Sequence, residues 1–85
     1  MSISKEVTFQ GYKISAYAMQ YLDDYWVGDY EITQDGWHIR TGKSVAFHAS
    51  EAGAQADALA MGIRYVTECV LPVVALRAKA LRFRR

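Results

Sequence analysis

The side chains that could do chemistry in this sequence are two histidines, one cysteine and an adjacent pair of aspartates. Imidazole and thiolate bind zinc and copper, and a cysteine beside a histidine can act as a nucleophile. Either site would need His38, His48 and Cys69 to meet from three different elements, without an acidic residue at ligand spacing. We therefore expect both histidines to be polar strand residues. Cys69 is expected in the core, because free cysteine is among the most buried residue types.

Two further motifs suggest sites and fail on spacing. Asp23 and Asp24 are a carboxylate pair, but adjacent residues in a turn point apart, so we expect a solvated turn. The run Thr41-Gly42-Lys43-Ser44 ends like a phosphate-binding loop, yet the glycine required five residues before Gly42 is replaced by Trp37. No helical pattern follows Ser44 directly, so the run is expected to be a tight connection between strands. The sequence thus predicts no catalytic residue, no metal and no cofactor, and a protein that is not an enzyme.

Length and composition limit the fold to one small domain. The chain has 85 residues, of which 52% are hydrophobic and 22% charged, with a single cysteine. This is too apolar for a disordered chain, and one cysteine excludes an internal disulfide framework. A domain of this size buries only about 60–65% of the surface of its unfolded chain, so association with a second copy is an effective way to stabilise it.

The first half of the chain has the alternation typical of β-strands. Strands are predicted from about Val7 to Gln20, broken or bent at Gly11-Tyr12, from Tyr25 to Thr33, from Trp37 to about Thr41, and over 45–48. Asp35-Gly36 is a hairpin signal, and a glycine within a strand, Gly28, suggests a bulge or a closely packed neighbour. The pattern indicates an antiparallel meander of four to five strands.

The second half has helical spacing. One apolar stripe runs along a helix from about Ser50 to Val70, and its residues are Ala52, Ala56, Leu59, Ile63, Val66 and Val70. Ser50 is a good N-cap, and Gly53 and Gly62 suggest close approach of the helix to the sheet. Pro72 is expected to stop or kink the helix. A second, basic amphipathic helix should follow, although its alternation also fits a strand added to a sheet edge. The fold class is α+β, with a domain over 1–71 and an extension over 72–85.

Charge is divided between the two ends of the sequence. Residues 1–76 carry nine acidic and five basic groups, for a charge of −4, whereas residues 77–85 carry +5. The basic arm consists of Arg77, Lys79, Arg82, Arg84 and Arg85. Its acidic counterpart lies in a stretch without Lys or Arg and consists of Asp23, Asp24, Asp29, Glu31 and Asp35. The arm can be a solvated helix end, a contact to the acidic strands of a second subunit, or a contact to nucleic acid.

Aromatic residues are concentrated in the sheet half. One helix cannot cover both faces of a meander, so we expect it on the face of Ile14, Ile32 and Ile39. The other face should then expose an interaction surface of aromatics, and its members are Tyr17, Tyr25 and Trp37. Acidic neighbours would repel phosphates, which favours a protein partner over stacked bases.

Several short runs resemble those of small uncharacterised bacterial β-meander-plus-helix proteins, a domain of unknown function. The runs are Phe9-Gln10-Gly11-Tyr12-Lys13-Ile14, Trp26, Tyr30-Glu31-Ile32, Asp35-Gly36, and Phe47-His48-Ala49-Ser50 leading to Gly62-Ile63. The resemblance covers about residues 7–68. It implies a small α+β fold and life in the cytosol, and it carries no activity or site.

The sequence therefore predicts a non-enzymatic protein-interaction module, self-associating as a homodimer through sheet aromatics and the basic arm. The alternative is a small nucleic-acid-binding protein that uses the same arm. The N-terminus has no signal-peptide pattern, and the longest strongly apolar run, Cys69 to Leu76, is too short to span a bilayer. We expect a cytoplasmic protein without membrane insertion.

Overall fold

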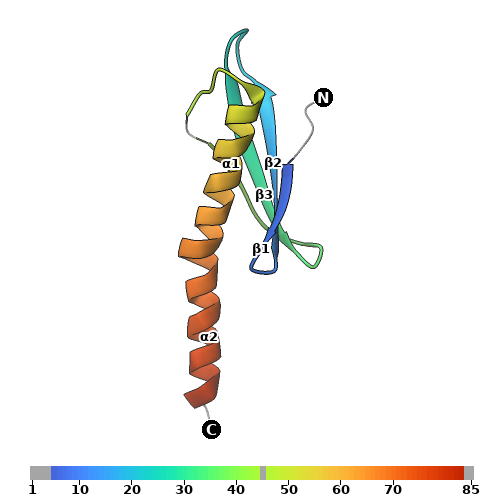
Figure 1. The fold of residues 1–85 in the computed structure, drawn as a ribbon. Helices are drawn as coiled ribbons and strands as arrows, with labels where there is room; N and C mark the ends of the chain where they lie inside the picture. Colours follow the sequence, from blue (N-terminus) through green and yellow to red (C-terminus); the bar gives the residue numbers. More distant parts are fainter. Residues whose placement is uncertain (1–4, 45, 84–85) are drawn as a thin grey trace.

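A computed structural model describes residues 5–44 and 46–83. Its sheet has four antiparallel strands in sequence order, which are β1 (Lys5–Phe9), β2 (Tyr12–Gln20), β3 (Trp26–Gln34) and β4 (Trp37–Lys43). One long helix lies on one face of the sheet and runs on beyond it (Figure 1). It consists of α1 (Glu51–Tyr65), a π-helical segment η1 (Val66–Val70) and α2 (Leu71–Phe83). The predicted α+β meander with one long packed helix is confirmed.

Two of the three hairpins, β1–β2 and β3–β4, turn on pairs of residues with positive φ. Gln10 and Gly11 join β1 to β2 with φ of 53° and 82°, and Asp35 and Gly36 join β3 to β4 with φ of 51° and 83°. Two successive positive φ values define a type I′ turn, whose twist matches that of the strands. The Asp-Gly prediction is confirmed, and the Gln-Gly pair explains why the first predicted strand divides in two.

Register decides which residues face the helix. Ile14 pairs with Ile32, and both are fully buried beneath α1, as predicted. A bulge between Ile32 and Thr33 then shifts the pairing, so that Ile32 faces Arg40 whereas Thr33 faces His38. Because one extra residue reverses the alternation, Ile39 is not buried as predicted but is 38% exposed.

The same bulge moves Trp37 to the opposite face from the one we predicted. Trp37 pairs with Gln34, which lies two residues beyond Ile32 along β3. Residues two apart on a strand share a face, so Trp37 belongs to the face that carries α1. The aromatic residues expected on one surface are therefore divided between two.

The helix packs on the sheet through small residues. Ala54, Ala58 and Gly62 are buried at the contact with β2 and β3. A Cβ on Gly62 would lie 2.6 Å from Ile14 Cγ2, and one on Gly28 would overlap the Ala54 carbonyl oxygen. The predicted close approach is confirmed at Gly28 and Gly62. It is wrong for Gly53, which lies nearest to its own N-cap, Ser50.

The buried stripe of the helix differs from the predicted one at its start. Ala52 and Ala56 are exposed, and the buried residues Ala54 and Ala58 lie on the opposite side of the helix. A run rich in alanine offers two apolar faces, and the hydrophobic pattern does not distinguish them. The prediction holds further along, where Val66 is fully buried. Ser50 is the N-cap, as predicted, and its hydroxyl accepts a hydrogen bond of 3.0 Å from the Gly53 amide.

Pro72 does not end the helix. The preceding η1 segment closes with a wide hydrogen bond from the Leu71 amide to the Val66 carbonyl, and α2 continues to Phe83. Proline lacks an amide proton, and a wide turn directly before it changes which carbonyls require a donor. The strand alternative for this segment is wrong. The extension predicted over 72–85 continues the long helix as far as residue 83.

Two short segments differ from prediction. Thr41, Gly42 and Lys43 belong to β4 and are not a tight connection; Gly42 is required because Tyr30 lies over it. The strand predicted over 45–48 is reduced to a single bridge between Trp26 and His48, and residue 45 lies outside the described residues.

We predict that Gly28→Ala lowers the free energy of unfolding by about 2 kcal/mol, because the new methyl group meets helix backbone that cannot rotate away. Urea unfolding followed by circular dichroism measures the change. Asp29→Ala, one residue along on the opposite face, should change it by less than about 0.5 kcal/mol. Equal effects of the two substitutions would contradict the close packing.

Candidate functional site

The residues that could do chemistry lie far apart. His38 is near the start of β4, with its Nε2 2.7 Å from the Thr41 hydroxyl. His48 lies in the segment between β4 and α1, and its Nε2 lies 2.8 Å from Asp57 Oδ2 on α1. Cys69 lies in η1 and is exposed, not buried as predicted, whereas Val66 and Val70 of the same segment pack against the core. Among the described residues no three His, Cys, Asp or Glu side chains could hold a metal ion.

The Gly-Lys-Ser run is structural. Gly42 and Lys43 lie in an extended strand, which cannot wrap a phosphate with its amides. Ser44 is buried, and its hydroxyl accepts a hydrogen bond of 2.9 Å from the Gly28 amide. Its own amide donates to the Gly28 carbonyl oxygen at 2.7 Å. Ser44 therefore fixes the end of β4 to the strand that α1 approaches most closely.

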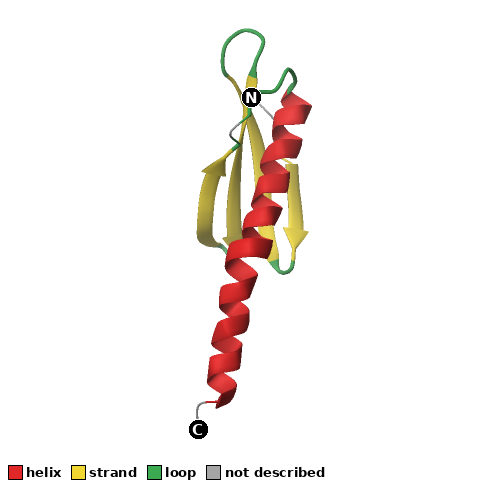
Figure 2. Ribbon diagram, turned by 90° about the vertical axis from the view of Figure 1, so that its left-hand side faces the viewer, coloured by secondary structure: helices red, strands yellow, loops and turns green. Residues whose placement is uncertain are grey.

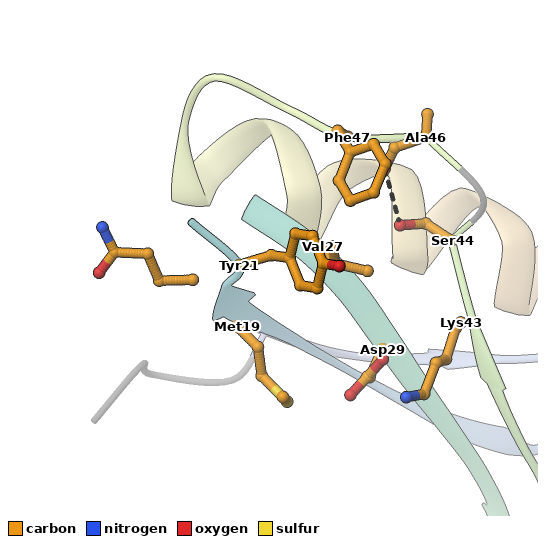
Figure 3. Close-up of a pocket in the computed structure, with 9 residues that line it drawn as sticks. Met19, Tyr21, Val27, Asp29, Lys43, Ser44, Ala46 and Phe47 are labelled. Carbon is orange, nitrogen blue, oxygen red and sulfur yellow. Dashed lines mark hydrogen bonds between the residues drawn. The ribbon is translucent and has the colours of Figure 1, made fainter. Parts of the chain in front are cut away.

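A hollow of about 290 Å³ opens at the end of the sheet where β2 ends and β3 begins. Figure 3 shows Tyr21, Val27 and Phe47 around it, with Asp29 and Lys43 on neighbouring strands at its base. Asp29 and Lys43 are register partners, so opposite charges lie side by side there. The hollow combines apolar walls with one acid and one base. Among the described residues that line it, the Ser44 hydroxyl accepts the hydrogen bond from the Gly28 amide, and no histidine lies beside it to act as a base.

The loop beside this hollow gathers exposed apolar side chains into what we name the aromatic end, made of Tyr21, Leu22, Tyr25 and Phe47. The ring centroids of Tyr21 and Phe47 are 5.2 Å apart, and those of Tyr25 and Phe47 are 6.2 Å apart. Leu22 has a φ of 84° and a side chain that is 67% exposed. A bulky residue in the left-handed region is strained, and such strain is concentrated at functional sites.

Sequence reasoning found only Tyr25 of the aromatic end. Tyr21 and Tyr25 flank the Asp23-Asp24 turn, and Tyr21 donates its amide to the Tyr25 carbonyl oxygen at 2.8 Å. The position of two tyrosines on either side of this turn was the sequence signal that could have added Tyr21 to Tyr25. Nothing in the sequence places Phe47 against them, since it lies in the irregular segment between β4 and α1.

The predicted aromatic surface is not a single patch. Tyr25 lies at one end of β3, Trp37 follows the hairpin at its other end, and Tyr17 lies between them on the face away from the helix. All three are exposed, with 38% for Tyr17, 49% for Tyr25 and 77% for Trp37. The structure separates Trp37 from the other two.

The charge clusters are separated along the long axis of a molecule that measures 60 × 22 × 14 Å. Asp23 and Asp24 lie in the β2–β3 loop, whereas Arg77 and Lys79 lie on α2 at the opposite end (Figure 1). Asp29 and Glu31 lie on β3, and Asp35 turns into β4 near the start of α2. Arg82 is helical, and Arg84 and Arg85 lie outside the described residues. Within one chain the arm cannot reach the acidic loop.

Arg40 is the cation on the helix face of β4. Its guanidinium lies 4.4 Å from the ring centroid of Tyr65, and its Nε donates to the Tyr30 hydroxyl at 3.3 Å. The hydrogen bond to Tyr30 raises the pKa of Arg40 above its ordinary value. This side chain stays charged and is directed toward its own helix.

By length and composition, one helix of the described residues, Glu51–Ala80, could cross a membrane, with a mean hydropathy of 1.6 over its most apolar 18 residues. Crossing would remove Gly62 and Val66 from the sheet, where both are buried. The uncharged run between Glu68 and Arg77 has eight residues. It would measure about 12 Å as a helix, against about 30 Å of hydrocarbon.

No protein-family model, curated protein or solved structure matches this chain. The resemblance to small bacterial β-meander proteins therefore stays a prediction. Function must be inferred from the surfaces themselves.

We predict that Leu22→Gly raises the free energy of unfolding by about 1 kcal/mol, because glycine adopts positive φ without strain and the lost side chain is exposed. Urea unfolding at low protein concentration measures the change. Leu22→Ala keeps the strain and serves as the control, with little change expected. A loss of stability in the glycine variant would contradict a strained loop.

Proposed function

We propose that this chain is a small non-enzymatic protein-interaction module that associates with a second copy of itself through α2. One observation carries the proposal: α2 leaves the sheet as a helix and exposes its apolar residues. Residues 72–80 are all exposed, including Val73 at 47%, Val74 at 48% and Leu76 at 66%. A helix of this composition is stable in water when its apolar side is covered by another element.

The size of the core supports the same proposal. Nine apolar residues of the described chain are buried, and four of them are alanine. Each valine or leucine side chain buried fully contributes about 1.5–3 kcal/mol. Covering Val73, Val74 and Leu76 against a partner would therefore add apolar burial that a domain of 85 residues lacks.

Absence of acidic residues on α2 favours a second candidate, binding of nucleic acid by the basic arm. The last acidic residue of the chain is Glu68, and five Arg or Lys residues follow it. Contacts of this kind neutralise phosphates, so affinity falls steeply with salt. A gel-shift titration with duplex and single-stranded DNA at 50 and 200 mM salt tests it, and no binding at either concentration removes it. The apolar half of α2 has no role in such binding, which is why we place self-association first.

We predict that Leu76→Glu weakens self-association at least tenfold, because a buried carboxylate replaces an apolar contact. Light scattering and sedimentation over a dilution series of the full chain measure the dissociation constant. Ala75→Glu adds the same charge to the side of α2 away from Val73, Val74 and Leu76 and should change that constant no more than about threefold. Unchanged circular dichroism in both variants shows that the fold is retained. A wild-type chain that stays monomeric at millimolar concentration contradicts the proposal.

A further inference from the structure

The sheet face that carries α1 is only half covered. The helix packs chiefly on β2 and β3, and it reaches β1 at one end. Every residue of β4 except Gly42 is exposed, although β4 forms the edge of the sheet beside β3. Figure 2 shows the helix crossing the sheet and leaving an edge strand on each side. On the helix face of β4, Gly42 lies under the Tyr30 ring and Arg40 lies over the Tyr65 ring, so the uncovered part of this face is its start, at Trp37.

Trp37 marks this surface. Its side chain is 77% exposed, which makes it the most exposed large apolar side chain among those described, and register places it on the helix face. Tryptophan is the residue most enriched at the energetic centres of protein interfaces. A shallow hollow of about 200 Å³ lies between the helix and β3 on the same face and is lined by Tyr30, Met61, Arg64, Tyr65, Glu68 and Cys69. Trp37 does not line it, so its exposed side chain is a separate apolar surface at the start of β4.

The second unpartnered surface, α2, lies at the same end of the molecule. β4 begins directly after the Asp35-Gly36 turn, and α2 leaves the sheet at that end (Figure 1). The long helix continues away from the sheet, so α2 cannot fold onto β4 of its own chain. A second copy turned by a two-fold axis beside this end can place its α2 on β4 of the first, and the first does the same in return.

α2 and β4 have similar lengths, and Asp35 in the turn before β4 has the opposite charge to the basic residues of α2. The 13 residues of α2 extend about 20 Å, and the 7 residues of β4 about 23 Å. Arg77 and Lys79 lie on α2, and Asp35 lies in the turn next to Trp37. Arg40, the cation already on this face, lies over the Tyr65 ring of its own helix.

We propose that α2 of one copy packs on the helix face of β4 of a second copy, with Trp37 at the centre of the contact and Asp35 facing the basic side chains of α2. This inference rests on the self-association proposed above and specifies its surface. Each sheet would then carry its own α1 and its partner's α2 side by side. The two contacts are identical by symmetry, which closes the assembly at two copies.

The first test is Trp37→Ala in the full chain, measured by sedimentation over a dilution series. The dissociation constant should rise at least tenfold, as it does for a tryptophan at the centre of an interface. Tyr17→Ala removes an exposed aromatic from the opposite face and should raise it less than threefold. Circular dichroism confirms that both variants fold.

The second test reports where Trp37 lies in the assembly. In a Trp26→Phe chain, Trp37 is the only fluorophore of its kind, and we expect acrylamide quenching to fall at least twofold between dilute and concentrated protein. Adding Leu76→Glu should restore full quenching at high concentration, whereas adding Ala75→Glu should not. If Trp26→Phe fails to fold, the Trp37→Ala measurement decides alone.

The outcomes separate the two proposals. A dimer that Leu76→Glu weakens but Trp37→Ala does not, with Trp37 fully quenched throughout, overturns this inference and leaves self-association through α2, for example against the partner's α2. A monomer at every concentration overturns the proposed function itself. A dimer that weakens in both variants and shields Trp37 is the result expected here.

Discussion

Close contact between α1 and the two central strands determines most of this structure. The contact is made by residues with little or no side chain, Gly28 on β3 and Ala54, Ala58 and Gly62 on the helix. Small residues let two backbones approach, and the approach brings Ile14, Ile32 and Val66 into one dry core. Larger side chains here would separate the layers by more than the core could fill. The rest of the molecule is arranged around this contact.

A narrow contact has a cost for the remaining surface. One helix held close to β2 and β3 cannot also cover β4, and its direction takes α2 past the end of the sheet. Two exposed apolar surfaces, α2 and the start of β4, are thus left at one end of the molecule. The acidic loop and the aromatic end are left at the other. A single chain therefore has a small buried core and much exposed apolar surface, which is how its architecture relates to the proposed function.

Local signals in the sequence predicted most of the fold. Asp35-Gly36, the alternation of β2 and β3, and the Ser50 cap each act over a few residues, and the structure confirms each of them. What failed depended on tertiary context. The bulge beside Thr33 reverses the faces of β4, and no residue there announces it, so Ile39 and Trp37 were placed on the wrong sides. Cys69 was expected in the core because free cysteine is usually buried, but Val66 and Val70 and not Cys69 are the residues of η1 that pack against the core.

The candidate surfaces could be predicted less well than the fold. The residues Tyr17, Tyr25 and Trp37 are exposed as expected, but the sheet distributes them over two faces and two ends. Phe47 joins Tyr21 and Tyr25 only because the segment between β4 and α1 pairs with the start of β3 at Trp26 and His48. This is a long-range contact without a local signature. The separation of charge was visible in the sequence, whereas the length of the molecule that keeps the acidic loop from the basic arm was not.

The π-helical turn before Pro72 sets the rotational phase of everything that follows it. A π turn holds one residue more than the α-helical turn it replaces, and each residue of an α-helix advances by about 100° around the axis. The residues of α2 therefore point in directions that differ from those of an uninterrupted helix by about a quarter turn or more. Loss of one residue from Val66–Val70 would rotate α2 about its own axis and leave the composition of α2 unchanged. Insertions and deletions among the exposed residues of this turn, Thr67, Glu68 and Cys69, thus give the chain a means of changing its partner.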